Sequence, residues 1–219
     1  MRPGDAVVRR VGPRPWGHEH ALTRAGLGPV AGCDEAGRGA CAGPLVAAAV
    51  VLPPRRNRAL DGLADSKTLT PARRAKLFDL VVDHAASVAW VEVSPAECDR
   101  LGMQEADLQG LRRAVSRLGV RPGYVLSDGF ALDGLDSPGL GMWKADAVCA
   151  CVAAASIVAK VVRDRIMVGL DAQWPGYGLA THKGYVTAEH QRALERLGPS
   201  PVHRRSYANV ARAARVHPS

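Results

Sequence analysis

The chain lacks the features that would place it in a membrane or in an oxidising compartment. Its longest apolar run, around VCACVAAASIVA, is shorter than the roughly 20 residues that cross a bilayer. Its N-terminal stretch has no apolar segment fit for a secretion signal. Its five cysteines follow no disulfide-like pattern, and Cys149 and Cys151 have no second Cys or His pair nearby to complete a zinc site. We therefore expect a cytoplasmic protein without membrane contact or structural zinc.

Lysine is scarce and nucleotide-binding motifs are missing. Only five of the 29 basic residues are lysines. No G-x-x-x-x-G-K-[ST] motif occurs, and the absence of this phosphate-binding motif argues against a nucleoside triphosphatase. The net charge of +8 is uneven, because residues 183–219 hold seven Lys or Arg against two Glu, a net of +5. A basic tail favours a polyanionic partner, although a solvated basic surface explains the charge equally well.

The patterns along the 219 residues indicate one α/β domain. Residues 30–35 and 45–52 predict an antiparallel hairpin, and SVAWVEV and YVLSD predict further strands. Helices are predicted after Thr70 and Ser94 by their capping residues, and MQEADLQGLRRAVSRLG predicts a helix ending at Gly119. The stretch from Met142 to Trp174 predicts a brief strand followed by one long, largely buried helix.

Four carboxylates occupy unusual places in this pattern. Asp34 and Glu35 lie between an apolar run and a glycine cluster, Asp128 closes a strand, and Asp146 begins a helix. Neighbouring strand residues point to opposite faces, so the first two converge only where twist or a turn re-aims one of them. Four such acids suit two hard divalent ions that hold a phosphodiester for cleavage. Each acid taken alone is explained as well by a cap or a turn.

Seven motifs, in order, resemble ribonuclease HII, the type 2 ribonuclease H of bacteria. They span residues 30–207 and are DEAGRGACAGP, ADSKTL, SDG, KADA, AAASIVAKVVRDR, HKGYVTAEH and HRRSY. The resemblance implies a ribonuclease H-like fold, with a mixed central sheet flanked by helices and a small helical C-terminal portion. It divides the chain into an N-terminal arm (1–29), a catalytic domain (30–180) and a substrate-clamping segment (181–219).

The resemblance also implies an activity and its residues. The activity is cleavage of the RNA strand of RNA–DNA hybrids, and incision 5′ of single ribonucleotides in duplex DNA, with Mn²⁺ or Mg²⁺. The family's metal-binding acids fall on Asp34, Glu35, Asp128 and Asp146, its glycine–arginine–glycine element on Gly37, Arg38 and Gly39, and its junction-sensing tyrosine on Tyr185. Glycines let the backbone approach the 2′-hydroxyl that separates RNA from DNA.

Further residues in the matching motifs are expected to contact substrate. The basic ones, predicted to contact phosphates, are Lys67, Lys160, Lys183, Arg204 and Arg205. Ser156, Lys160 and Arg163 recur at about helical spacing and predict a polar side on their helix, although Arg163, Asp164 and Arg165 suit structural salt bridges equally well. Ala145 stands where the family commonly has Gly. The segment WGHEH matches nothing in the family and is interpreted as an ordinary polar segment.

Two other functions remain open on the sequence. A DNA nuclease of the same fold, such as a junction resolvase, would share the acids and metals, but the Gly37–Gly39 element and Tyr185 argue against it. A nucleic-acid-binding module with an inactive centre is the second, and the presence of all four acids argues against that. We expect the protein to act as a monomer on RNA–DNA hybrids and on duplex DNA containing ribonucleotides.

Overall fold

A mixed five-stranded sheet forms the centre of the computed structural model, which describes residues 16–63 and 66–216. The strand order is β3-β2-β1-β4-β5. The strands are β1 (Val30–Ala36), β2 (Leu45–Val51), β3 (Ser87–Val93), β4 (Tyr124–Asp128) and β5 (Gly139–Met142). β1, β2 and β3 pair antiparallel, as the predicted hairpin requires, whereas β1, β4 and β5 pair parallel. The predicted mixed α/β sheet is therefore confirmed.

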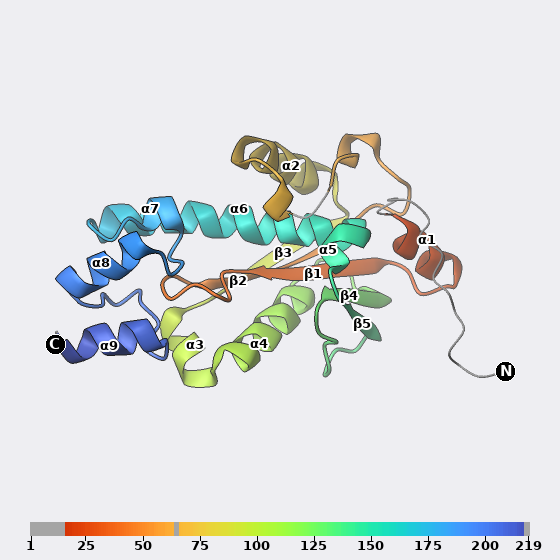
Figure 1. Cartoon of the computed structure of the whole chain (residues 1–219). Helices are drawn as coiled ribbons and strands as arrows, with labels where there is room; N and C mark the ends of the chain where they lie inside the picture. The colour runs from red at the N-terminus through yellow and green to blue at the C-terminus, as the bar shows by residue number, and fades with distance from the viewer. Residues whose placement is uncertain (1–15, 64–65, 217–219) are drawn as a thin grey trace.

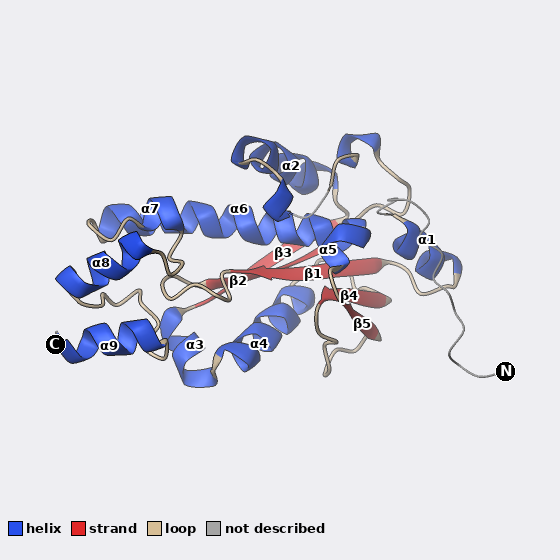
Figure 2. Cartoon of the chain, in the orientation of Figure 1, coloured by secondary structure: helices blue, strands red, loops and turns tan. Residues whose placement is uncertain are grey.

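Helices cover both faces of this sheet (Figure 1). They are α1 (Gly17–Arg24), α2 (Pro71–His84), α3 (Pro95–Leu101), α4 (Met103–Ser116), α5 (Ala145–Val148), α6 (Ala150–Gln173), α7 (Leu179–His182), α8 (Ala188–Leu197) and α9 (Ala208–Val216), with short 3₁₀ turns at Arg58–Leu60 and Ser66–Thr68. α2 and α6 pack on one face, and α3 and α4 pack on the other, each over its own apolar cluster. Figure 2 shows the strands enclosed between these two helical layers.

The capping residues set the starts of two helices as predicted. The Thr70 hydroxyl accepts from the Arg73 N–H at 3.3 Å, and Pro71 follows at the first helical position. The Ser94 hydroxyl likewise accepts from the Glu97 N–H at 3.2 Å. Hydrogen bonds between residues close in the chain can be predicted from the sequence, and α2 and α3 both begin at the predicted residues.

Two predicted boundaries are wrong. α4 ends at Ser116, short of Gly119, because the Leu118 N–H bonds the Val115 carbonyl three residues back, in place of the i→i−4 bond that would continue the helix. The stretch from Met142 forms two helices, since extended backbone at Cys149 (φ −119°, ψ 124°) separates α5 from α6. The strand before them lies earlier, at Gly139–Met142. The break at Cys149 gives Asp146 a short helix of its own.

The segment WGHEH is not an ordinary polar segment. It begins α1, whose Glu19 is only 7% exposed and accepts a hydrogen bond from the Cys151 N–H at 2.9 Å. The first N–H groups of a helix have no partner within the helix, so Glu19 caps α6 from a distant part of the chain. Residues 1–15 of the predicted arm, and residues 64 and 65 of the ADSKTL motif, lie outside the described residues.

The C-terminal helices share a third apolar cluster with the tip of the β1–β2 hairpin. Cys41 and Ala42 from the hairpin pack with Met167 of α6, Leu194 of α8 and Val210 of α9. Figure 1 shows α7, α8 and α9 gathered at one end of the molecule, with α1 at the other end. No helix among the described residues has both the length and the apolarity needed to cross a bilayer.

Candidate active site

Parallel pairing gathers the predicted carboxylates at one edge of the sheet. Asp34 and Glu35 lie near the end of β1, and Asp128 ends β4, the parallel neighbour of β1. Asp146 follows β5 in α5, and the Asp128 carboxylate accepts the Ala145 N–H at 2.7 Å, which ties α5 to β4. The carboxyl ends of parallel strands meet at the same edge, so the fold brings all four acids to one region.

The two adjacent acids share some neighbours and differ in others. Asp34 is 5% exposed and accepts a hydrogen bond from Ser156 of α6, and its Oδ1 also accepts the Glu35 N–H at 2.8 Å. Among the charged groups around Glu35, Asp107 of α4 affects its pKa most, and the Glu35 side chain also forms a hydrogen bond with Asp34. β1 continues through both residues to Ala36, yet their side chains stay close enough to interact, so strand alternation does not separate them fully.

The electrostatics of this edge favour a bound cation. Burial, and then the charge of Glu35, raises the pKa of Asp34 well above its usual range. Burial, followed by the charge of Asp107, raises the pKa of Glu35 to about 7. Buried carboxylates that repel one another need positive charge or hydrogen bonds to remain ionised. The donor set, which consists of carboxylate oxygens, fits hard divalent ions.

The carboxylates do not form a closed ligand cluster in the structure. Across residues 16–63 and 66–216, no group of three or more His, Cys, Asp or Glu side chains stands close enough together to hold a metal ion. Hydrogen bonds within the protein engage Asp34 and Asp128 instead. Metal binding at this edge would require these carboxylates to turn toward a common ion.

Asp107 is a site residue that the sequence did not reveal. It is 2% exposed on α4, and its Oδ2 lies 3.3 Å from Nη1 of Arg38. Burial raises its pKa to about 6, and Arg38 acts in the opposite direction. The Arg38 guanidinium also lies 4.9 Å from the centre of the Phe130 ring. The only sequence signal for Asp107 was a charge on the apolar side of a predicted helix.

A pocket of about 230 Å³ joins most of the predicted substrate-binding residues. It is lined by Glu35, Ala36, Gly37, Arg38, Gly39, Ser66, Lys67, Ser156, Lys160 and Tyr185. At Gly37 the backbone has φ +94°, and a Cβ there would lie 1.9 Å from Nε of Arg163, so only glycine fits. A Cβ on exposed Gly39 would lie 3.9 Å from the Tyr185 ring, so the turn and the tyrosine face each other.

Arg204 is not placed to contact phosphate, contrary to the prediction. Its side chain is 0% exposed, and its guanidinium donates to the carbonyls of Gly43 (3.1 Å), Gly37 (2.8 Å) and Arg38 (3.2 Å). Arg204 therefore stabilises the Gly37–Gly39 turn from inside the protein, by hydrogen bonds to its backbone. The neighbouring Arg205 is exposed, and its backbone N–H donates to Asp99 at 2.7 Å.

The polar side predicted for α6 is mostly engaged within the protein. Ser156 is 3% exposed and shares a hydrogen bond of 2.8 Å with Ser66. Lys160 donates to Asp164 at 2.6 Å, and burial lowers its pKa. Arg163 is 0% exposed and donates to backbone carbonyls, those of Pro44, Lys183 and Ala42. Arg163 therefore has a structural role, but through backbone carbonyls and not through the salt bridge considered from the sequence.

The last two lysines of the prediction differ in their surroundings. Lys67 lines the pocket from the 3₁₀ turn Ser66–Thr68. Lys183 has left-handed backbone at φ 53°, and its ammonium donates to the carbonyl of Ala180. Lys183 does not line this pocket, so among the predicted basic residues Arg38, Lys67 and Lys160 lie next to the carboxylate edge.

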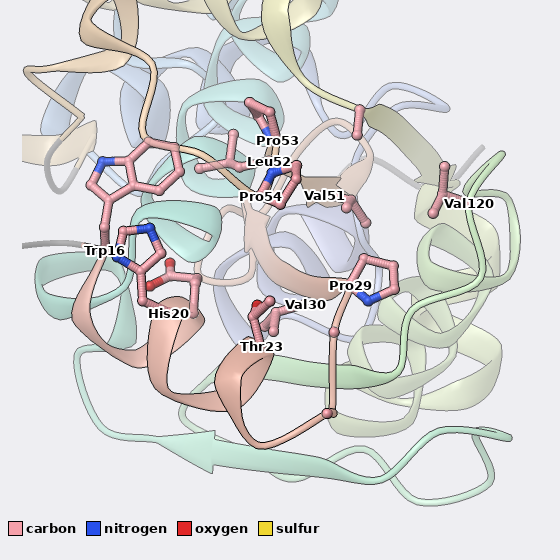
Figure 3. A pocket seen from close by; sticks show the side chains of 14 residues that line it. Trp16, His20, Thr23, Pro29, Val30, Val51, Leu52, Pro53, Pro54 and Val120 are labelled. Atoms are coloured by element: carbon pink, nitrogen blue, oxygen red, sulfur yellow. The ribbon is translucent and has the colours of Figure 1, made fainter.

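A larger pocket, of about 350 Å³, lies at the opposite end of β1 (Figure 3). Trp16, Pro29, Val30, Val51 and Leu52 line it, and none of the predicted site residues do. Its walls are mainly apolar, and Glu19, the cap of α6, is its one carboxylate. Its position at the start of β1 separates it from the carboxylate edge at the end of that strand.

Comparisons with known proteins identify the family of this chain. The family model for ribonuclease HII matches residues 31–210. A ribonuclease HII from Cutibacterium acnes is 71% identical over 93% of this chain and the whole of that relative.

Solved structures agree as well. The ribonuclease H2 of Pyrococcus horikoshii has a TM-score of 0.74 at 29% identity, covering 85% of this chain and 97% of that one. The ribonuclease HII of Archaeoglobus fulgidus, solved in complex with PCNA, has a TM-score of 0.70 at 26% identity, covering 81% and 94%. The chain therefore belongs to the ribonuclease HII family.

Proposed function

We propose that this chain is a divalent-metal-dependent endoribonuclease. It cleaves the RNA strand of RNA–DNA hybrids and cuts 5′ of single ribonucleotides in duplex DNA, leaving 3′-hydroxyl and 5′-phosphate ends. The observation that carries the proposal is one pocket that joins Glu35, the Gly37–Gly39 turn and Tyr185 beside the buried Asp34. A carboxylate edge for metal and a turn for a sugar thus lie next to each other. Within this proposal the protein acts as a monomer in the cytoplasm.

Asp34, Glu35, Asp128 and Asp146 would hold the metal, either Mg²⁺ or Mn²⁺. Bound divalent ions neutralise the scissile phosphate and activate the attacking water. The acids would contribute a negatively charged edge, at which burial, and then the charge of Glu35, raises the pKa of Asp34. Ser156 keeps Asp34 oriented through its hydrogen bond.

The glycine turn supplies recognition of the ribose. The carbonyls of Gly37 and Arg38 accept from Arg204, so the shape of the turn is fixed by a buried side chain. Backbone N–H groups of the turn would then bond the 2′-hydroxyl, which a deoxyribose lacks. Leaving such groups without their partner costs about 1–3 kcal/mol each, which disfavours all-DNA duplexes.

Tyr185 would contact the deoxyribose that follows the ribonucleotide. Its side chain is 38% exposed, and its ring lies 5.5 Å from the guanidinium carbon of buried Arg163, which supports the ring from one side. Lys67, Lys160, Lys183 and Arg205 remain candidates for phosphate contacts that position the duplex without reading sequence. The ammonium of Lys160 would have to exchange Asp164 for a phosphate.

The test compares two substrates with and without metal. A DNA duplex with one ribonucleotide and a uniform RNA–DNA hybrid are incubated with wild type, Tyr185→Ala and Asp136→Asn, in Mg²⁺, in Mn²⁺ and with chelator. Asp136 has a side chain that is 87% exposed and is the matched control. We expect cleavage only with metal, normal activity of Asp136→Asn, and a larger loss for Tyr185→Ala on the single ribonucleotide. Metal-independent cleavage, or equal losses on both substrates, would contradict the proposal.

A further inference from the structure

Three histidines from separate parts of the C-terminal segment lie together beside Tyr185. They are His182 at the end of α7, His190 in α8 and His203 before α9. The His182 and His190 rings lie 4.3 Å apart at 18°, and the His190 and His203 rings lie 5.2 Å apart. His190 is 0% exposed and His203 is 2% exposed. Groups so buried must have their hydrogen bonds satisfied within the protein.

The hydrogen bonds assign a neutral form to each ring. Nδ1 of His203 accepts the Ser200 N–H at 3.1 Å, so its proton is on Nε2, which lies 3.0 Å from Nε2 of His190. His190 therefore accepts at Nε2 and carries its proton on Nδ1, which donates to the Tyr185 carbonyl at 3.0 Å. Each group therefore donates to the next, from Ser200 to His203, from His203 to His190, and from His190 to the Tyr185 carbonyl.

His182 completes the set from the other side of the same turn. Its Nδ1 accepts the Gly184 N–H at 3.2 Å, so its Nε2 proton donates to the Tyr177 carbonyl at 2.8 Å. Imidazole rings thus bond two neighbouring backbone groups: His182 bonds the Gly184 N–H, and His190 bonds the Tyr185 carbonyl. The turn itself is unusual, since Lys183 (φ 53°) and Gly184 (φ 76°) are both left-handed. A non-glycine residue in that conformation persists only where its surroundings hold it.

The same turn is joined to the recognition hairpin. The Gly184 carbonyl accepts from the N–H groups of Cys41 (3.0 Å) and Ala42 (3.3 Å), just after the Gly37–Gly39 turn. The Lys183 carbonyl accepts from Arg163 at 2.9 Å. Movement of the Lys183–Tyr185 backbone would therefore alter the placement of the Tyr185 ring relative to Gly39.

We propose that His182, His190 and His203 are positioning residues that fix Tyr185 against the Gly37–Gly39 turn, and so set discrimination in favour of a single ribonucleotide. The inference rests on the proposed role of Tyr185 and adds the residues through which that role is established. His190 contributes most, because of the three rings only that of His190 forms a hydrogen bond with the Tyr185 backbone. His203 acts one step further away, by holding His190 in the tautomer that donates.

The test uses variants of His190 that differ in one hydrogen bond. His190→Asn keeps an N–H donor where Nδ1 lies, whereas His190→Leu fills similar space without a donor. For each, kcat/KM is measured on a single-ribonucleotide duplex and on a uniform hybrid, and their ratio is compared with wild type. One neutral hydrogen bond is worth about 0.5–1.5 kcal/mol, so we expect His190→Leu to lower the ratio about three- to tenfold. His190→Asn should stay closer to wild type.

A double variant separates this inference from the proposed function. If His190 acts through Tyr185, adding His190→Leu to Tyr185→Ala should lower the ratio no further. An unchanged ratio in His190→Leu, with a lowered ratio in Tyr185→Ala, would overturn the inference and leave the proposed function standing. An unchanged ratio in Tyr185→Ala would overturn both. Should His190→Leu not fold, the same comparison is made with His203→Leu and His203→Gln, of which the glutamine keeps a donor toward His190.

Discussion

At the scale of single residues, the buried carboxylates at the end of β1 destabilise the fold without metal when they are ionised. The pKa of Glu35 is about 7 in the folded protein, where burial and Asp107 raise it from the 4.5 that is usual for a glutamate. A group with a raised folded pKa stabilises the fold below its unfolded pKa, and this contribution is lost as pH rises through the folded pKa. The free energy of unfolding without metal should therefore fall between about pH 4.5 and 7.

Glu35→Gln should remove part of this pH dependence. We expect it to raise the free energy of unfolding at pH 8, with chelator present, by on the order of 1–3 kcal/mol, and to change it little at pH 4.5. Denaturant titrations of wild type and variant at both pH values measure the difference. His203, whose pKa burial lowers to about 4, acts in the opposite direction below pH 6.5. The contribution of His203 is the same in wild type and in Glu35→Gln, so it cancels when their stabilities are compared at one pH. Equal stability at pH 8 would contradict the electrostatic account.

Arg204 and Arg205 provide a test of burial against exposure in adjacent arginines. Arg204→Lys cannot keep three carbonyl partners, because an ammonium lacks the planar fork of the guanidinium. We expect a loss of about 2–4 kcal/mol in the free energy of unfolding, from carbonyls left without donors in a buried place. Arg205→Lys, on the surface, should lie within about 0.5 kcal/mol of wild type. Similar stabilities for the two variants would contradict the structural role of Arg204.

At the scale of elements, the helices and strands that depend on neighbouring residues were predictable. The hairpin, the caps at Thr70 and Ser94 and the strand ending at Asp128 follow from local patterns, and the structure has them. Glu19 was not predictable, because its partner lies 132 residues away, at Cys151. Arg204 was misplaced for the same reason: its motif indicated a basic residue, and only the tertiary packing shows it buried.

The remote cap at Glu19 should contribute to the stability of α6. Glu19→Ala removes the acceptor for the Cys151 N–H, and loss of a helix cap costs about 0.5–2 kcal/mol. His18→Ala, in the same helix but exposed, should have little effect. Thermal denaturation of both variants measures the effect. If Glu19→Ala and His18→Ala melt alike, the cap contributes nothing to the stability of α6.

At the scale of the whole molecule, the net charge of +8 predicts binding that weakens with salt. Arg205→Ala should lower the slope of log Kd against log salt by about one unit if the guanidinium contacts a phosphate. Arg121→Ala is the matched control, since its side chain is 77% exposed and pairs with Asp136. Binding titrations at several salt concentrations give both slopes. A slope that changes equally in the two variants would assign Arg205 to the general positive field.

The central claim is that the carboxylate edge at Asp34 cuts a strand at the ribonucleotide chosen by the neighbouring glycine turn. The most direct measurement maps the cut in a DNA duplex with one ribonucleotide, using wild type and Asp34→Asn in Mg²⁺, with an all-DNA duplex in parallel. We expect one cut by wild type, 5′ of the ribonucleotide, with 3′-hydroxyl and 5′-phosphate ends, and none in the all-DNA duplex or by Asp34→Asn. Cutting of the all-DNA duplex, or normal turnover by Asp34→Asn, would contradict the account.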